Sequence, residues 1–99
     1  MSLDELRKVV DQINEEIVAL FARRLEITKQ IAKVKKEQKL PVDDFSREEK
    51  QYKMLRELSQ KHGLSPAVIE EIFNLLVDYS KLTMKMEMGH VEKDRLPGN

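Results

Sequence analysis

Apolar residues recur along the first third of the chain at alternating spacings of three and four. This rhythm is typical of one face of an amphipathic helix, and its members are Leu6, Val10, Ile13, Ile17, Leu20, Ile27, Ile31 and Val34. Ser2 and Glu5 fit a capping box at the start, and no proline or glycine follows before Pro41. The pattern predicts a helix from about residue 3 to about residue 38, which would be roughly 54 Å long.

A shorter helix is predicted after a loop that contains Pro41. Its candidate N-caps are Asp44 and Ser46, and Gly63 follows as its stop signal. Its apolar face is expected to bury three residues: Tyr52, Leu55 and Leu58.

A third helix is predicted from Ser65, which fits an N-cap, and Pro66, which fits the first turn, to a stop at Gly89. Its apolar face is broad and consists of Ile69, Ile72, Phe73, Leu76, Val77, Tyr79 and Leu82. No strand pattern or repeat appears, so the expected fold class is all-α, a three-helix chain with one very long N-terminal helix. We expect one domain over residues 1–89 and a frayed or disordered polar tail at residues 90–99.

The long helix also predicts a partner chain. A compact monomer of about 100 residues has a radius of gyration near 13 Å, so such a helix would protrude from it. Its charge is uneven, because residues 1–22 hold five acids and two bases whereas residues 23–39 hold seven bases and two acids. Two copies pair best antiparallel, with unlike ends together. We therefore expect an intertwined antiparallel homodimer.

Composition excludes several classes of chemistry and partner. Lys and Arg number 18 and Asp and Glu number 18, so no net field draws the chain to nucleic acid or to an anionic membrane. The absence of cysteine excludes disulfides, thiolate metal sites and thiol nucleophiles. No apolar run approaches the ~20 residues of a membrane span, and the first residues lack the apolar core of a signal peptide. A soluble cytoplasmic protein that binds neither nucleic acid nor membrane is expected.

One position breaks the rhythm of the long helix, because Arg24 stands where the spacing predicts an apolar residue. A guanidinium on a core-facing seam costs on the order of several kcal/mol unless an anion pairs with it. Lys35 lies about three full turns further on, so Arg24, Thr28 and Lys35 share a face and their side chains can converge on one small anion. The plainer interpretation is that Arg24 pairs with a buried glutamate of another helix and that Lys35 lies in solvent.

Charges in the first turn of the second predicted helix favour a ligand site. Arg47 and Glu48 fall there, and Glu48 shares the apolar face of its helix, so it points inward. Several cations with one or two acids suit a polyanion that also carries a hydroxyl. Arg7 lies about 25 Å before Arg24 and on another face, so only antiparallel pairing would bring it to a site, which would be that of the partner chain.

The chain resembles the AroQ class of chorismate mutases in three segments: LRKVVDQINEEIVALFARRLEITKQIAKVK, PVDDFSRE and LVDYSKLT. The resemblance extends to about residue 86, with ordered positions on all three predicted helices. It implies an intertwined all-α dimer that rearranges chorismate to prephenate, a step towards phenylalanine and tyrosine. It implies no cofactor and no metal.

The resemblance also implies roles for individual cations. Arg24 and Arg7 of the partner chain resemble the carboxylate-binding arginines of the family. Lys35 resembles the lysine that bridges a carboxylate and the ether oxygen of the breaking C–O bond. Together with Glu48, whose role is to hold the ring hydroxyl, Arg24 and Lys35 are the expected catalytic residues.

The remaining expected contacts surround the substrate ring. Asp44 and Glu48 resemble the positions that hold the ring hydroxyl, with Arg47 in support. Ser80 resembles the serine near the ring carboxylate. The expected substrate-binding set is therefore Arg7, Arg24, Lys35, Asp44, Arg47, Glu48, Ser80 and Met84.

Met84 departs from the family pattern, because well-known members carry there a glutamine that donates to the ether oxygen. Methionine has no such donor, and loss of one donor to developing charge costs about 2 to 4 kcal/mol. A slower enzyme, another donor or a shifted substrate preference is expected. Two alternatives stay open: an isochorismate pyruvate lyase, which shares the fold and much of the cationic pocket, and a non-catalytic helical dimer that acts as a scaffold or ligand sensor.

Overall fold

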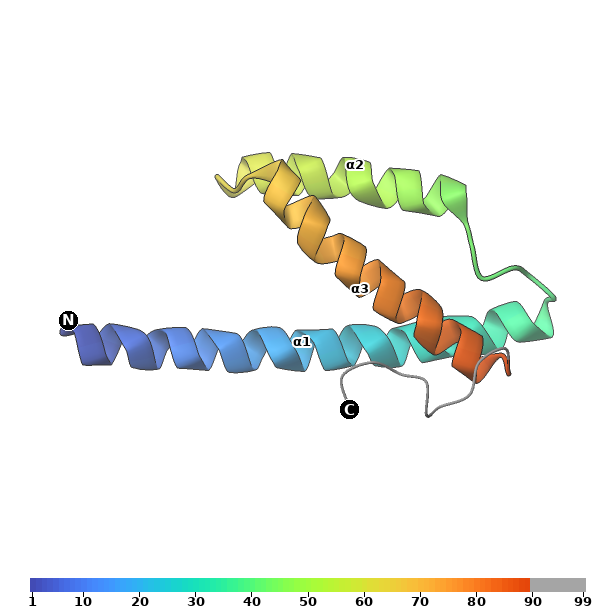
Figure 1. Ribbon diagram of the computed structural model, residues 1–99, viewed down its shortest axis with the longest axis horizontal. Helices are drawn as coiled ribbons and strands as arrows, with labels where there is room; N and C mark the ends of the chain where they lie inside the picture. The colour runs from blue at the N-terminus through green and yellow to red at the C-terminus, as the bar shows by residue number, and fades with distance from the viewer. Residues whose placement is uncertain (90–99) are drawn as a thin grey trace.

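The computed structural model describes residues 1–89, which form three α-helices without a strand (Figure 1). The helices are α1 (Leu3–Glu37), α2 (Phe45–Lys61) and α3 (Pro66–Glu87). The all-α class and the very long first helix are confirmed. The expectation of a frayed tail concerns residues 90–99, which lie outside the described residues.

The ends of α1 follow from local hydrogen bonds. The Ser2 hydroxyl accepts the backbone N–H of Glu5 at 3.1 Å, as the capping box predicts. At the other end Lys39 adopts a left-handed conformation with φ of 56°, and the N–H of Leu40 turns back to the carbonyl of Lys35 at 2.8 Å. This closure directs the chain back towards the other helices.

The two shorter helices are also capped by side chains. Asp44, not Ser46, caps α2, and its carboxylate accepts the backbone N–H three residues on at 3.1 Å. Gly63 then ends α2 with a φ of 68°, a conformation that glycine adopts without strain. Ser65 caps α3 with Pro66 at its first position, and Gly89 follows its end, as predicted.

Helix α3 connects the other two helices, since it packs against both α1 and α2. In Figure 1 it runs diagonally from the end of α2 down to the C-terminal half of α1, and the N-terminal half of α1 projects beyond it. The chain is correspondingly elongated, with a radius of gyration of 16.5 Å and a longest dimension of 54 Å. A compact chain of this length has a radius near about 13 Å.

The core of the single chain is small. Among residues 1–89 the buried apolar side chains are Ala32, Leu55 and Val77. The prediction that Leu58 is buried is wrong, because it is 43% exposed and the neighbouring Ser59 faces the interior at 2% exposure. Ser59 lies one turn beyond Leu55, on the side of α2 that packs against α3.

The apolar face of α1 is only partly covered within residues 1–89. All eight residues of the three-four rhythm are between 40% and 58% exposed.

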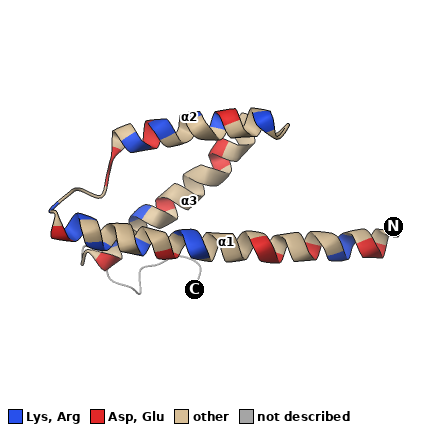
Figure 2. Ribbon diagram, turned by 180° about the vertical axis from the view of Figure 1, so that it is seen from behind, with Lys and Arg blue, Asp and Glu red and all other residues tan. Residues whose placement is uncertain are grey.

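Figure 2 shows that Lys and Arg of α1 gather mainly in the half where α3 crosses it. No helix among the described residues has the length and apolar character needed to cross a membrane.

Candidate functional site

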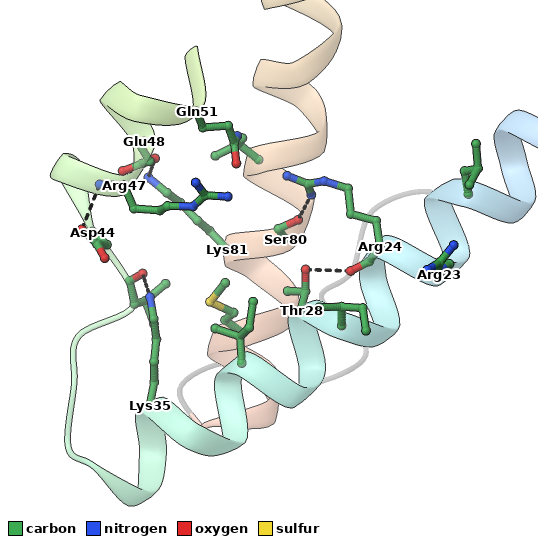
Figure 3. Close-up of a pocket in the computed structure, with 16 residues that line it drawn as sticks. Arg23, Arg24, Thr28, Lys35, Asp44, Arg47, Glu48, Gln51, Ser80 and Lys81 are labelled. Atoms are coloured by element: carbon green, nitrogen blue, oxygen red, sulfur yellow. Dashed lines mark hydrogen bonds and ion pairs between the residues drawn. The ribbon is translucent and has the colours of Figure 1, made fainter. Parts of the chain in front are cut away.

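A cavity of ≈ 560 Å³ lies where α1, α2, α3 and the loop between α1 and α2 meet (Figure 3). Seven of the eight residues predicted for the site line it: Arg24, Lys35, Asp44, Arg47, Glu48, Ser80 and Met84. Arg7 is exposed on the N-terminal half of α1 and does not line it. The structure thus brings seven of the predicted residues together in one cavity, and Arg7 lies apart from the cavity of its own chain, as its position along the helix predicted.

Arg24 enters the cavity from α1 and is held by α3. Its guanidinium donates a hydrogen bond to the hydroxyl of Ser80 at 2.5 Å, and its backbone carbonyl accepts the Thr28 hydroxyl at 3.0 Å. The plainer interpretation of Arg24 is wrong, since no carboxylate among residues 1–89 lies within ion-pair distance. Burial lowers the pKa of Arg24, and the nearby Arg47 guanidinium lowers it further. Figure 3 shows these two guanidinium groups reaching towards each other from α1 and α2.

Lys35 ties the loop to the cavity wall. Its ammonium donates to the backbone carbonyl of Val42 at 2.8 Å, so the side chain is not free in solvent as the plainer interpretation required. An ammonium has three N–H donors. Two of them therefore remain for a ligand.

Glu48 faces the cavity from the first turn of α2. One carboxylate oxygen, Oε1, lies 2.7 Å from the ammonium of Lys81. The other, Oε2, is buried and has no hydrogen-bond partner among the described residues. Burial raises the pKa of the neighbouring Tyr52 hydroxyl, and the negative charge of Glu48 raises it further. A buried carboxylate oxygen without a donor is unfavourable, so this atom is suited to accept a hydroxyl from a ligand.

The cavity carries more positive charge than its own acids neutralise. Within residues 1–89 no carboxylate lies within 4.0 Å of the charged groups of four lining cations: Arg23, Arg24, Lys35 and Arg47. Lys81 differs from them, because it contacts both Glu48 and Asp43. Cations that lack a carboxylate partner in a partly closed cavity favour a bound anion with more than one negative group.

Sequence reasoning missed three polar residues of the cavity: Arg23, Gln51 and Lys81. Lys81 lies four residues after Val77 and three before Met84, on the face that α3 presents to the cavity. The rule that singled out Arg24, a cation at an apolar helix position, finds Lys81 when it is applied to α3. Gln51 lies one turn after Arg47 and one turn before Leu55, so helical spacing also places it on this face.

Comparison with known proteins decides the family. Residues 6–85 match the family model of chorismate mutase type II. The chain belongs to this family. The resemblance to the AroQ class, predicted from three segments of the sequence, is confirmed.

Relatives of this type II chorismate mutase chain occur as separate and as fused proteins. It is 31% identical over 90 residues to a chorismate mutase of Methanocaldococcus jannaschii, and the match covers 91% of both chains. It is 35% identical to the T-protein of Haemophilus influenzae, over 72% of this chain and 19% of the relative. It is 31% identical to the bifunctional chorismate mutase/prephenate dehydratase of Escherichia coli, over 81% of this chain and 21% of the relative. The chain therefore spans nearly all of the first relative and about a fifth of the other two.

Proposed function

We propose that this chain is a chorismate mutase, which converts chorismate to prephenate in aromatic amino acid biosynthesis, and that it works as a homodimer with two shared sites. Membership of the type II chorismate mutase family supports the assignment of this reaction to the chain. The observation that supports the site is the set of four lining cations without a carboxylate partner in residues 1–89. Chorismate is a dicarboxylate and supplies the negative charge that the cavity lacks.

The reaction matches what these side chains offer. The rearrangement breaks a C–O bond and forms a C–C bond within one molecule, and no proton moves to or from the protein. The protein contributes by holding the reactive conformer and by placing cations where the ether oxygen gains negative charge. Arg24 suits a carboxylate clamp, because guanidinium binds carboxylate through two parallel bonds, and Lys35 suits a point contact with the ether oxygen.

The acidic side of the cavity fits the hydroxyl of the substrate. Glu48 offers a buried oxygen without a partner among residues 1–89. Asp44 and Arg47 flank it at the start of α2 and line the same cavity. In this proposal the ring hydroxyl donates to Glu48, and the carboxylates lie towards the guanidinium groups.

The size of the exposed surface supports the homodimer. The chain has a total accessible surface of 8050 Å², whereas a compact monomer of this mass has about 5,800 Å². The apolar face of α1 accounts for part of this excess, and a second antiparallel copy would cover it. That arrangement also gives Arg7 a role, because it would contribute Arg7 to the cavity of the partner chain as a further carboxylate ligand.

The decisive test is the loss of chorismate absorbance with the purified protein, followed by identification of the product. Prephenate as the product supports the proposal. Met84 lines the cavity without a donor for the ether oxygen, and it favours one second candidate, the isochorismate pyruvate lyase. Release of pyruvate from isochorismate without turnover of chorismate would replace the mutase by that lyase. A folded protein that turns over neither compound would contradict both.

A further inference from the structure

We propose that Lys81 is a positioning residue of this site, which fixes the Glu48 carboxylate so that one oxygen is neutralised and the other accepts the hydroxyl of the substrate. The inference rests on the proposed chorismate mutase function. It adds Lys81 as a residue that does not contact the atoms of the breaking C–O bond or the forming C–C bond, and that acts through Glu48.

The ammonium of Lys81 joins three parts of the chain. It reaches from α3 to Oε1 of Glu48 on α2 at 2.7 Å and to Oδ1 of Asp43 in the preceding loop at 2.9 Å. These hydrogen bonds, first with Glu48 and then with Asp43, raise the pKa of Lys81, so it stays charged. Since two of its three N–H groups serve these carboxylates, only one remains, so Lys81 cannot bind a substrate carboxylate through two hydrogen bonds.

The ion pair with Lys81 also explains the orientation of the Glu48 carboxylate. Its side chain is 24% exposed, and the ion pair holds Oε1 on the side of α3 while Oε2 stays buried without a partner in the described chain. Arg47 on α2 and Arg24 and Lys35 on α1 line the same cavity and offer other partners for a mobile carboxylate. Without Lys81, Glu48 would turn to these cations and occupy the place of a substrate carboxylate. Lys81 thus keeps the acid of the site apart from its cations.

A double-mutant cycle between Lys81 and Glu48 tests this role. The variants are Lys81→Met, Glu48→Gln and the double variant. For each of them kcat and KM for chorismate are measured at a temperature equally far below its thermal midpoint. Lys81→Met is expected to lower kcat/KM about ten- to hundredfold in the wild-type background. It is expected to lower it less than about threefold in the Glu48→Gln background, because Lys81 then has no catalytic carboxylate to position.

Two further variants separate positioning from a general effect of charge or folding. Lys81→Arg keeps the charge and the donors and is expected to recover most of kcat/KM. Lys85→Met removes a lysine one turn further along α3 that is exposed and does not line the cavity, and it is expected to keep wild-type kinetics. If Lys81→Met does not fold, Lys81→Gln, which keeps a donor, replaces it in the cycle.

The outcomes distinguish this inference from the proposed function. Wild-type turnover with undiminished Lys81→Met activity overturns the role of Lys81 alone. An equal loss in both backgrounds overturns it as well, since that result indicates a contact with substrate or a structural role. A wild-type protein that leaves chorismate unchanged overturns the proposed function and this inference with it.

Discussion

Arg24 on α1 donates a hydrogen bond to the hydroxyl of Ser80 on α3, although 56 positions separate the two residues in the sequence. The bond joins two helices at the wall of the cavity and orients the guanidinium. An arginine has five N–H donors, so several remain for a ligand. A helix position whose spacing predicts an apolar residue therefore holds a fixed cation at the point where the proposed substrate carries its charge.

The first prediction concerns the opposing effects of Arg24 on stability and on activity. Arg24→Leu is expected to lower kcat/KM at least about hundredfold, because a charge-assisted carboxylate clamp is lost. The thermal midpoint is expected to stay the same or rise, because an apolar side chain replaces a guanidinium with no carboxylate beside it in residues 1–89. Chorismate kinetics and thermal unfolding check the two parts. A large fall in the midpoint with activity retained would show that Arg24 is a structural residue.

The second prediction assigns Lys35 to the transition state. Lys35→Met is expected to lower kcat about 10²- to 10³-fold, the scale of one lost donor to developing charge, with a smaller change in KM. Lys36→Met is the matched control, because Lys36 is the next residue, is exposed and does not line the cavity. Steady-state kinetics on both variants separates the two positions. Equal losses in both would contradict the assignment.

The third prediction tests the shared site by complementation. Arg7→Ala and Lys35→Met are each expected to be nearly inactive alone. Half of the dimers in an equal mixture after re-association contain one copy of each, and each such dimer has one intact site, so about a quarter of wild-type activity should return. Mixing two samples that carry the same substitution provides the control. If the unlike mixture regains nothing although heterodimers form, Arg7 does not serve the cavity of the partner.

The fourth prediction concerns the pH dependence of stability at the Lys81 ion pairs. The hydrogen bond from Lys81 lowers the pKa of Asp43 below its ordinary value of 3.8, so the stability it contributes is present above that pH and is lost as pH falls further. The pKa of Lys81 is raised above its ordinary value of 10.5, so its contribution is present below that pH and is lost as pH rises beyond it.

Asp43→Asn is the variant that measures this dependence. It is expected to lower the thermal midpoint by a small, salt-sensitive amount between about pH 5 and about pH 9, because the pair is partly exposed. The midpoints of the variant and the wild type should converge as pH falls below the lowered pKa of Asp43, where the wild-type carboxylate also becomes neutral. Thermal unfolding across this range checks the expectation, and a difference that persists unchanged at low pH would contradict it.

Much of the fold was predictable from the sequence because its signals are local. The three-four rhythm and the caps at Ser2 and Ser65 depend on neighbouring residues, and the structure places the helix ends where they predict. The burial of Ser59 in place of Leu58 was not predictable, because it depends on which side of α2 meets α3. Packing of this kind depends on the angle between helices, which no local pattern contains.

The site shows the same division between local and long-range information. Arg24 was recognisable because a cation broke an apolar rhythm on its own helix. The partner of Lys81 was not recognisable, because Glu48 lies 33 positions earlier in the sequence and only the fold brings the two together. The unpartnered oxygen of Glu48 is likewise visible only once the surrounding helices are in place.

The last prediction concerns Met84, which lines the cavity at a position where the resemblance to the AroQ class implies a glutamine. Met84→Gln restores an amide donor of nearly the same length, on the helix that also holds Ser80. Because the ether oxygen gains negative charge in the transition state, an added donor there is expected to raise kcat about tenfold or more with little change in KM. Met84→Leu is the control for side-chain volume and is expected to leave kcat within about threefold of wild type. A kcat that does not rise in Met84→Gln would contradict the expectation and would indicate that another residue, such as Gln51 of the same cavity, already supplies the donor.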